Sequence, residues 1–278
     1  MLTPTADLVG AAASDGAGIA AFNGITVEHG EAIVSAAESV GQPVILALSH
    51  NAVRFHGALR PIAAAYRALA EDAAVPVGLH LDHVEDAALV EEAVGLGFGS
   101  VMYDAATLPY EENVAATAAV AETVHARGLW LEAELGEIGG KDGAHAPHVR
   151  TDPAEAAAYV SATGVDALAV AVGTSHAMTS TTATVDLDLV ARLKDAVPVP
   201  LVLHGSSGVG DDGLAAAVSA GLVKINVGTQ LNLAYTAAVR AGLEASTSPD
   251  PRRYLTTART DMEAVVRRLI GVIREGAT

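Results

Sequence analysis

Three histidines stand at the ends of short apolar runs, at the positions where buried strands would end. These runs are Val77–His83, Val170–His176 and Pro200–His204. Three imidazole ligands leave one position of a tetrahedral metal site open, which is the arrangement of a catalytic divalent metal. The sequence therefore predicts a metalloenzyme.

Asp82 directly precedes the first of these histidines. A carboxylate beside a metal ligand can transfer a proton at a substrate that the metal polarises. The alternative is that Asp82 caps a helix that begins at Glu85. His80 and Asp82 share one face of the strand by its period of two, whereas regular alternation points His83 to the other face. We therefore expect the strand to end or turn at His83.

Further carboxylates follow the neighbouring runs. Asp104 and Glu134 stand at strand ends, and Glu132 shares a strand face with Glu134. Carboxylates inside a barrel are costly unless they are paired or bound to metal. Asp104 and Glu134 can therefore serve a second metal position, or they can hydrogen-bond the histidines as outer partners.

Two segments have the composition of an anion site. Gly205–Gly210 follows His204 directly and can offer successive backbone N–H groups, and Asn226–Thr229 opens a predicted helix. The loops after the seventh and eighth strands are the usual phosphate site of a TIM barrel. A phosphorylated ligand is expected here.

These residues can meet only if their strands lie side by side. Apolar β-type runs alternate with alanine-rich helical segments, such as 85–95, 111–127 and 211–220, which is typical of a parallel sheet with helical crossovers. Eight strands are expected, at 18–23, 43–49, 77–82, 100–104, 130–134, 167–173, 200–204 and 223–227. We predict an α/β fold, a single (β/α)8 TIM-barrel domain over residues 1–278. An extra C-terminal helix over 261–275 is expected to close over one end.

The composition excludes several classes of function. The 278 residues are 51% hydrophobic and carry a formal net charge of −17, which disfavours nucleic acid as a partner. Cysteine is absent, so thiolate ligands and nucleophiles are excluded. The start lacks the pattern of a secretory signal, and no apolar stretch reaches the length of a membrane helix. We expect a cytoplasmic protein with no membrane partner.

Ordered motifs along nearly the whole chain carry a resemblance to a known family. They are Ala21–Asn23, Pro43–Leu46, His80–His83, Gly97–Asp104, Leu108–Asn113, Glu132–Gly136, Gly139–Gly140, Thr163–Ala169, Gly173–His176, Leu203–Gly205 and Lys224–Val227. The chain resembles the class II, metal-dependent ketose-bisphosphate aldolases, which include the fructose-bisphosphate and tagatose-bisphosphate aldolases. The resemblance implies that His83, His176 and His204 bind a catalytic Zn²⁺.

The resemblance also implies roles for the other polar residues. Asp82 would exchange a proton with the C4 hydroxyl of a phosphorylated ketose, while Asp104 and Glu134 would form a second metal position. Ser49 and Arg259 would lie near the aldehyde-side phosphate, with Arg259 reaching into a neighbouring subunit of a homo-oligomer, a dimer or tetramer. A monovalent cation near the phosphate is a further expected cofactor. The residues for the dihydroxyacetone-phosphate half would be Ala177, Gly205, Ser206, Ser207, Asn226, Val227, Gly228 and Thr229, and Asn23 is a further substrate-binding residue.

The activity implied is cleavage and formation of a ketose such as fructose or tagatose 1,6-bisphosphate, giving dihydroxyacetone phosphate and an aldehyde. Several residues depart from the family pattern. Lys141-Asp142-Gly143 stands where the family's mobile loop usually has a glutamate. Either Asp142 substitutes for it as proton carrier, with a shorter reach, or exchange of the substrate carbon proton is slow. Ala177 and Ser206 each replace a glycine near the phosphate, and Ala47–Asn51 alters the aldehyde side.

Three alternatives stay open at this point. A metal-dependent TIM-barrel hydrolase would use the same metal to activate water, although the paired His-x-His of its first strand is absent. A barrel that binds sugar phosphate without turnover would explain the altered 141–143 loop. A Schiff-base aldolase would need a lysine on a strand, and Lys224 is the only lysine on a predicted strand.

Overall fold

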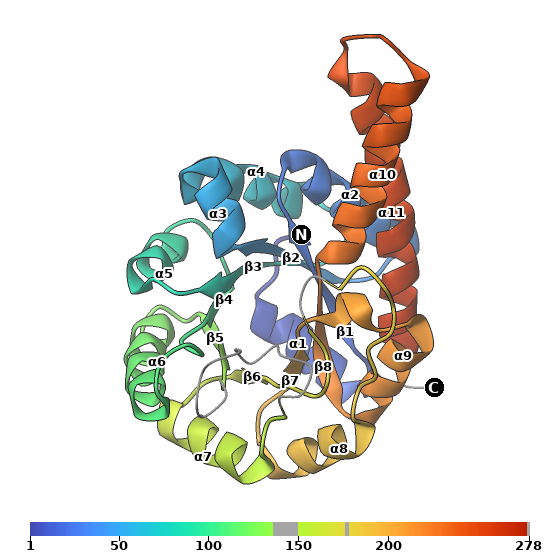
Figure 1. The fold of residues 1–278 in the computed structure, drawn as a ribbon. Coiled ribbons are helices and arrows are strands. Elements are labelled where there is room, and N and C mark those ends of the chain that lie inside the picture. Colours follow the sequence, from blue (N-terminus) through green and yellow to red (C-terminus); the bar gives the residue numbers. More distant parts are fainter. Residues whose placement is uncertain (136–149, 176–177, 277–278) are drawn as a thin grey trace.

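The chain folds as a closed barrel of eight parallel strands. The computed structural model describes residues 1–135, 150–175 and 178–276. Each strand pairs with the next, and the eighth pairs with the first (Figure 1). The strands are β1 (Ile19–Gly24), β2 (Val44–Ser49), β3 (Val77–Val84), β4 (Ser100–Tyr103), β5 (Trp130–Glu134), β6 (Ala167–Ala169), β7 (Leu201–Leu203) and β8 (Leu222–Val227). The prediction of an eight-unit barrel is confirmed.

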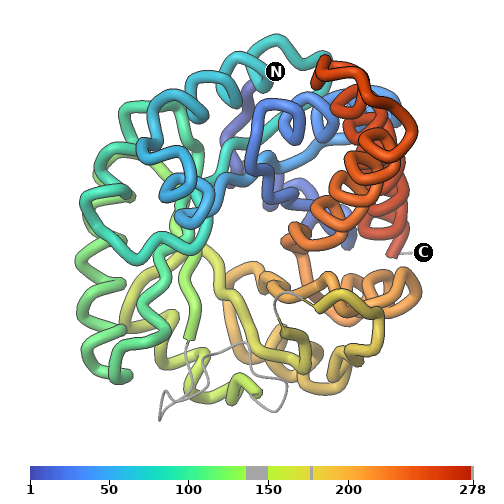
Figure 2. The backbone as a smooth tube through the Cα atoms, turned by 45° about the horizontal axis from the view of Figure 1, so that its top comes forward, coloured from blue at the N-terminus to red at the C-terminus, as the bar shows by residue number. Residues whose placement is uncertain are grey.

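Helices surround the strands as an outer ring, apart from α1, which lies beneath the barrel (Figure 2). Those of the described part are α1 (Thr5–Ser14), α2 (Val27–Val40), α3 (His50–His56), α4 (Leu59–Asp72), α5 (Ala87–Val94), α6 (Tyr110–His125), α7 (Pro153–Thr163), α8 (Leu187–Ala196), α9 (Asp211–Ala220), α10 (Thr229–Ala245) and α11 (Pro251–Glu275). A short 3-10 turn, η1, covers Ser206–Gly208. None of these helices is both long and apolar enough to cross a membrane.

Alternation along the strands separates two cores. One face of each strand packs outward against the helices, as Leu46, Leu79 and Val101 do. The other face fills the barrel interior, where a separate apolar cluster includes Ile45 and Met102. Because the strands are buried on both faces, they read as continuous apolar runs in the sequence.

Helix α1 was not among the expected elements. It packs beneath the barrel, where Leu8, Val9 and Ala12 join the interior apolar cluster. The first residues also pair with the start of β3 through the bridge between Leu2 and Val77. This end of the barrel is therefore sealed by apolar side chains, and the polar strand ends lie at the other end.

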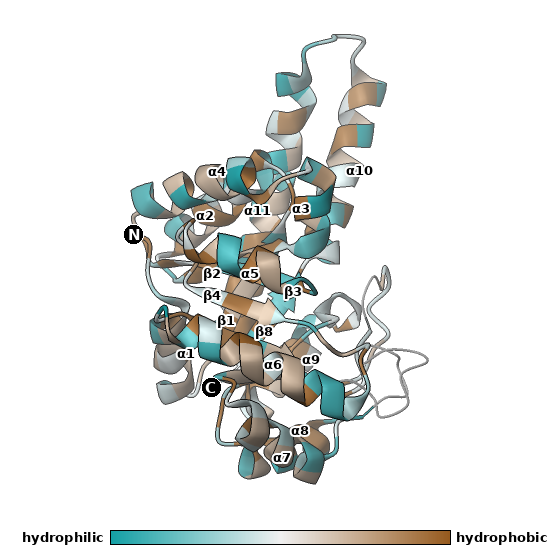
Figure 3. Ribbon diagram, turned by 90° about the vertical axis from the view of Figure 1, so that its left-hand side faces the viewer, coloured by the Kyte–Doolittle hydropathy of each residue, from teal (hydrophilic) through white to brown (hydrophobic). Residues whose placement is uncertain are grey.

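The C-terminal helix differs from the prediction in two ways. It begins at Pro251, with Asp250 as its cap, ten residues before the predicted start at 261. It packs beside α2, α9 and α10 in the outer ring instead of closing over an end of the barrel. The C-terminal half of α10 and the N-terminal half of α11 project from the barrel as a helical arm (Figure 3). Leu233 and Leu243 on α10 are 44% and 54% exposed.

Candidate active site

A bulge in β3 brings two neighbouring side chains into the barrel mouth. The register against β4 shifts between Leu81 and Val84, and His83 has a φ of 49°. A non-glycine residue in this left-handed region costs about 1–2 kcal/mol, and bulges of this kind re-aim side chains near active sites. Asp82 and His83 can therefore both face the site, although they are adjacent. The expected turn at His83 is confirmed.

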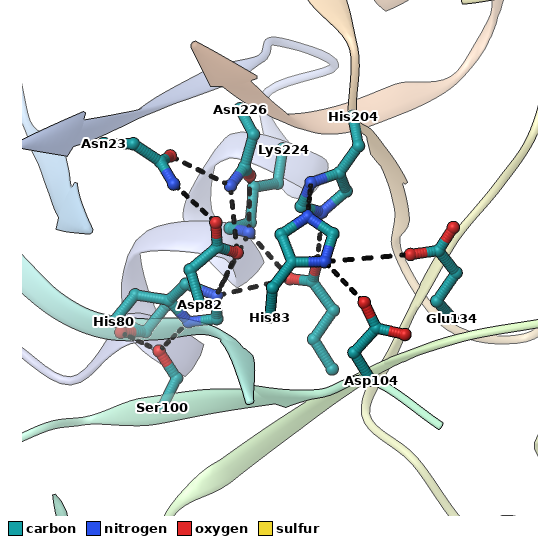
Figure 4. Close-up of polar contacts among 12 residues, drawn as sticks. Asn23, His80, Asp82, His83, Ser100, Asp104, Glu134, His204, Lys224 and Asn226 are labelled. Carbon is teal, nitrogen blue, oxygen red and sulfur yellow. Dashed lines mark hydrogen bonds and ion pairs between the residues drawn. The ribbon is translucent and has the colours of Figure 1, made fainter. Parts of the chain in front are cut away.

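The alternative role of Asp82 as a helix cap is wrong. Helix α5 is capped by Asp86, whose side chain accepts a hydrogen bond from the Ala88 backbone N–H. Asp82 instead lies buried between two amides (Figure 4). Asn23 Nδ2 donates to its Oδ2 at 2.5 Å, and Asn226 Nδ2 donates to its Oδ1 at 3.2 Å. These contacts fix the direction of the carboxylate.

His83 and His204 converge at the centre of the site. His83 Nε2 lies 3.1 Å from His204 Nδ1. Each outer nitrogen contacts a carboxylate, with Asp104 2.7 Å from His83 Nδ1 and Glu132 2.8 Å from His204 Nε2. Carboxylates in this position set the tautomer of a metal-binding imidazole. Both inner nitrogens then present lone pairs to one space, which suits a cation.

The charges around His83 favour a cation as well. Burial alone would lower the pKa of His83, but Asp82, Asp104 and Glu134 together raise it to about 10. Burial would raise the pKa of Asp82, yet the neighbouring histidines hold it well below its usual range. The ligand atoms of Asp82, His83 and His204 lie within 4.8 Å of one another, as do those of His83, Asp104 and Glu134. The donor set therefore fits a divalent metal ion.

His176 lies outside the described residues, and so do Ala177 and Asp142. The described segment before His176 is tied to the strand end of His204, because Thr174 Oγ1 donates to the His204 carbonyl at 2.6 Å. Ser175 packs against Gly205. The chain thus lies beside His204 at Ser175, the residue that directly precedes the predicted ligand His176.

A pocket of about 220 Å³ opens beside the two histidines. Among its described lining residues, the predicted ones are Asn23, Ser49, Asp82, His83, His204, Gly205, Ser206, Ser207, Asn226, Gly228 and Thr229. The lining also includes Asn51, the last residue of the Ala47–Asn51 segment expected on the aldehyde side. Gly24, Ile25 and Asn232 line it too, and sequence reasoning missed these three. Asn232 lies one helical turn after Gly228, so the helical period alone would have placed it at the pocket.

The predicted anion segments border this pocket. Gly205 takes a left-handed conformation with φ 68° and leads into η1. The Ser206 hydroxyl donates to the Asn226 carbonyl. The side chain that Ser206 has in place of the family's glycine is therefore directed to β8. Among the described residues no side chain caps the first turn of α10 at Thr229. Backbone N–H groups at such a helix start bind anions.

Other predicted residues lie farther away. Val227 is buried beside the pocket, whereas Arg259 on α11 forms an ion pair with Glu31 of α2. Arg259 lines a surface depression with acidic neighbours and does not line the pocket of its own chain. Its role at a neighbouring subunit's site stays a prediction.

A larger cavity of about 620 Å³ lies at the opposite end of the barrel, near the end of α1. Its described lining is mainly apolar and contains Lys194 but no carboxylate and no imidazole. Chemistry in this fold takes place at the carboxyl ends of the strands. The smaller polar pocket is therefore the candidate active site.

Comparison with known proteins decides the family. Residues 3–276 match the family model described as fructose-bisphosphate aldolase class-II. The chain belongs to the class II fructose-bisphosphate aldolase family. This aldolase is 38% identical to the fructose-bisphosphate aldolase of Thermus caldophilus, with 96% of both chains covered. It is 36% identical to a probable fructose-bisphosphate aldolase of Bacillus subtilis strain 168, which covers 99% of this chain and 97% of the relative.

Solved structures agree with this assignment. The YdjI aldolase of Escherichia coli K12 superposes with a TM-score of 0.88 at 30% identity, over 98% of this chain and 97% of YdjI. The protein is thus a carbon–carbon lyase, and the family match decides against the hydrolase and against a barrel without turnover.

Proposed function

We propose that this aldolase reversibly cleaves a ketose 1,6-bisphosphate of the fructose or tagatose type, giving dihydroxyacetone phosphate and an aldehyde. The observation that carries the proposal is the meeting of Asp82, His83 and His204 beside the Gly205 turn. The names of the curated relatives support the same substrate class.

His83, His176 and His204 would hold a zinc ion, with Asp104 and Glu134 either orienting His83 or serving a second metal position. When bound, zinc supplies a Lewis acid that stabilises the negative charge left on the ketose fragment as C3–C4 breaks. The contacts of His83 and His204 with Asp104 and Glu132 support this ligand assignment.

Asp82 would move the proton. Its depressed pKa keeps it a carboxylate at neutral pH, so it can accept the C4 hydroxyl proton while C4 becomes an aldehyde carbonyl. In the condensation direction it would return that proton. Asn23 and Asn226 hold the carboxylate, so little reorientation is needed when substrate binds.

The phosphate of the dihydroxyacetone half would bind the backbone at Gly205–Ser207 and the first turn of α10. The described pocket lining includes no lysine or arginine. A second phosphate therefore needs a cation from another segment, and Arg259 of a neighbouring subunit is the residue we propose. This proposal implies a homo-oligomer.

The experiment is Asp82→Ala, assayed with fructose and tagatose bisphosphates and for bound zinc. We expect zinc to be retained and cleavage to fall by about 10²-fold or more. Asp188→Ala, an exposed aspartate on α8, is the matched control and should keep wild-type activity. Unchanged turnover in Asp82→Ala would remove Asp82 from the chemistry, and cleavage that survives a chelator would overturn the zinc assignment.

A further inference from the structure

Lys224 places a buried ammonium directly beneath the site. Its side chain has no exposed surface, and its Nζ donates to Asn226 Oδ1 at 2.6 Å and to Glu132 Oε2 at 2.7 Å. His80 Nε2 lies 3.4 Å away as a third acceptor. An ammonium has three protons, so all of them have partners. Lys224 does not line the pocket, which argues against a Schiff-base role.

One branch of this contact set leads to His204. Glu132 gives one carboxylate oxygen to Lys224 and the other to His204 Nε2, at 2.7 and 2.8 Å. Glu132 is fully buried, and a buried carboxylate needs a compensating charge. Lys224 supplies that charge, and by holding Oε2 it orients Oε1 toward the imidazole.

The other branch leads to Asp82. An amide side chain has one accepting and one donating end, and the hydrogen bond from Lys224 occupies the accepting Oδ1 of Asn226. The donating Nδ2 is therefore turned toward Asp82 Oδ1. Without the ammonium, Asn226 Oδ1 loses its donor, and the amide that donates to Asp82 is no longer held from its other end.

We propose that Lys224 is a positioning residue that sets the orientation of both the proton-carrying carboxylate Asp82 and the imidazole of His204. This inference rests on the proposed function, because it takes its meaning from the roles given to those two residues. Lys224, the only lysine on a strand in the described part of the chain, thus orients two residues of the site and does not react with substrate.

The first test is Lys224→Met, which keeps the length of the side chain and removes its charge. We expect zinc affinity, measured by competition with a chromophoric chelator, to fall by about 10-fold to 100-fold. We expect kcat to fall by a similar factor with a smaller change in KM, because Asp82 acts in the chemical step.

The second test is the double variant Lys224→Met/Glu132→Gln. We expect it to fold even if the single variant fails, because it buries no uncompensated charge. The amide introduced at position 132 keeps an oxygen that can accept from His204 Nε2, so zinc affinity should return close to the wild-type value. The kcat should stay low, because Asn226 remains unheld. In an Asn226→Ala background the same double change should add little further loss of kcat, since the hydrogen bonds from Lys224 to Asp82 run through Asn226. His80 Nε2 offers only the longer contacts, 3.4 Å from Lys224 Nζ and 3.5 Å from Asp82 Oδ1.

Met262→Ala, a core variant on α11 outside the site, controls for lost stability. The inference is overturned if kcat recovers together with zinc affinity in the double variant. It is also overturned if the Lys224 variants bind zinc and turn over as Met262→Ala does. If Asp82→Ala keeps full activity, the proposed function fails, whereas loss in Asp82→Ala with wild-type behaviour in the Lys224 variants overturns this inference alone.

Discussion

Gly205→Ala is the most direct test of the junction between the strand end of His204 and the segment before His176. Gly205 has φ 68°, and a Cβ added there would lie 2.7 Å from the carbonyl carbon of Ser175 and 2.9 Å from its nitrogen and oxygen. The left-handed conformation costs an alanine about 1–2 kcal/mol, and overpacking of this kind costs about 1–3 kcal/mol. The two contributions together give a loss of about 2–5 kcal/mol in the free energy of unfolding.

For a chain of this size each kcal/mol lowers Tm by about 2–4 °C, so the expected drop is roughly 4–20 °C. The backbone of Ser175 must also move, which displaces Thr174 from its 2.6 Å hydrogen bond to the His204 carbonyl. Zinc affinity should therefore fall along with Tm, although no ligand has been replaced. Thermal unfolding and chelator competition measure the two effects separately.

Gly210→Ala is the matched control in the same loop. Its φ is −73°, and an added Cβ would meet no atom within 4 Å. Because Gly210 is the N-cap of α9, where alanine is less favourable than glycine, we expect this variant to lose no more than about 1 kcal/mol of stability. Its zinc affinity should stay at the wild-type value. If Gly205→Ala were as stable as Gly210→Ala, the close packing of Ser175 against Gly205 would not exist in solution.

Two further predictions concern stability away from the site. Burial raises the pKa of Tyr66 and Tyr159 above the usual tyrosine range, so they stabilise the fold below pH 10 and this contribution is lost as pH rises beyond it. Two of the six tyrosines should therefore ionise, by ultraviolet absorbance, only as circular dichroism reports unfolding, and early ionisation of all six would contradict this. Met262→Ala removes a fully buried side chain of α11 and should cost about 2–5 kcal/mol in urea unfolding, with kcat unchanged. A parallel loss of kcat would show that α11 packing reaches the site.

The barrel was predictable because its strands are buried on both faces. Such strands leave short apolar runs in the sequence, and polar residues then stand out at their ends. Asp82 and His204 were recognisable for this reason, before any contact between them was known. Helix α9 was predicted with the bounds it has in the structure, Asp211–Ala220, because acidic residues mark its start and a glycine follows its end.

Other features depend on contacts between residues distant in the sequence. Helix α1 has no special pattern of its own, and its apolar face is explained only by the barrel interior above it. The start of α11 did carry a signal, Asp250 before Pro251, but the polar turns that follow in the arm obscured it. From the sequence, a Schiff base was the only role that could be considered for Lys224. Its partners Glu132 and His80 come from other strands, so its contacts could not be predicted.

The geometry of α10 has a consequence for any protein that binds the arm. This helix starts at Thr229 in the pocket and runs outward to Ala245. One continuous helix therefore joins the proposed phosphate side of the site to the outer surface. Its 17 residues span about 25 Å, and a tilt of about 2° displaces one end by roughly 1 Å relative to the other. Displacements of that size are large enough to alter catalysis. A contact that tilts α10 would therefore shift Thr229 relative to the rest of the pocket lining.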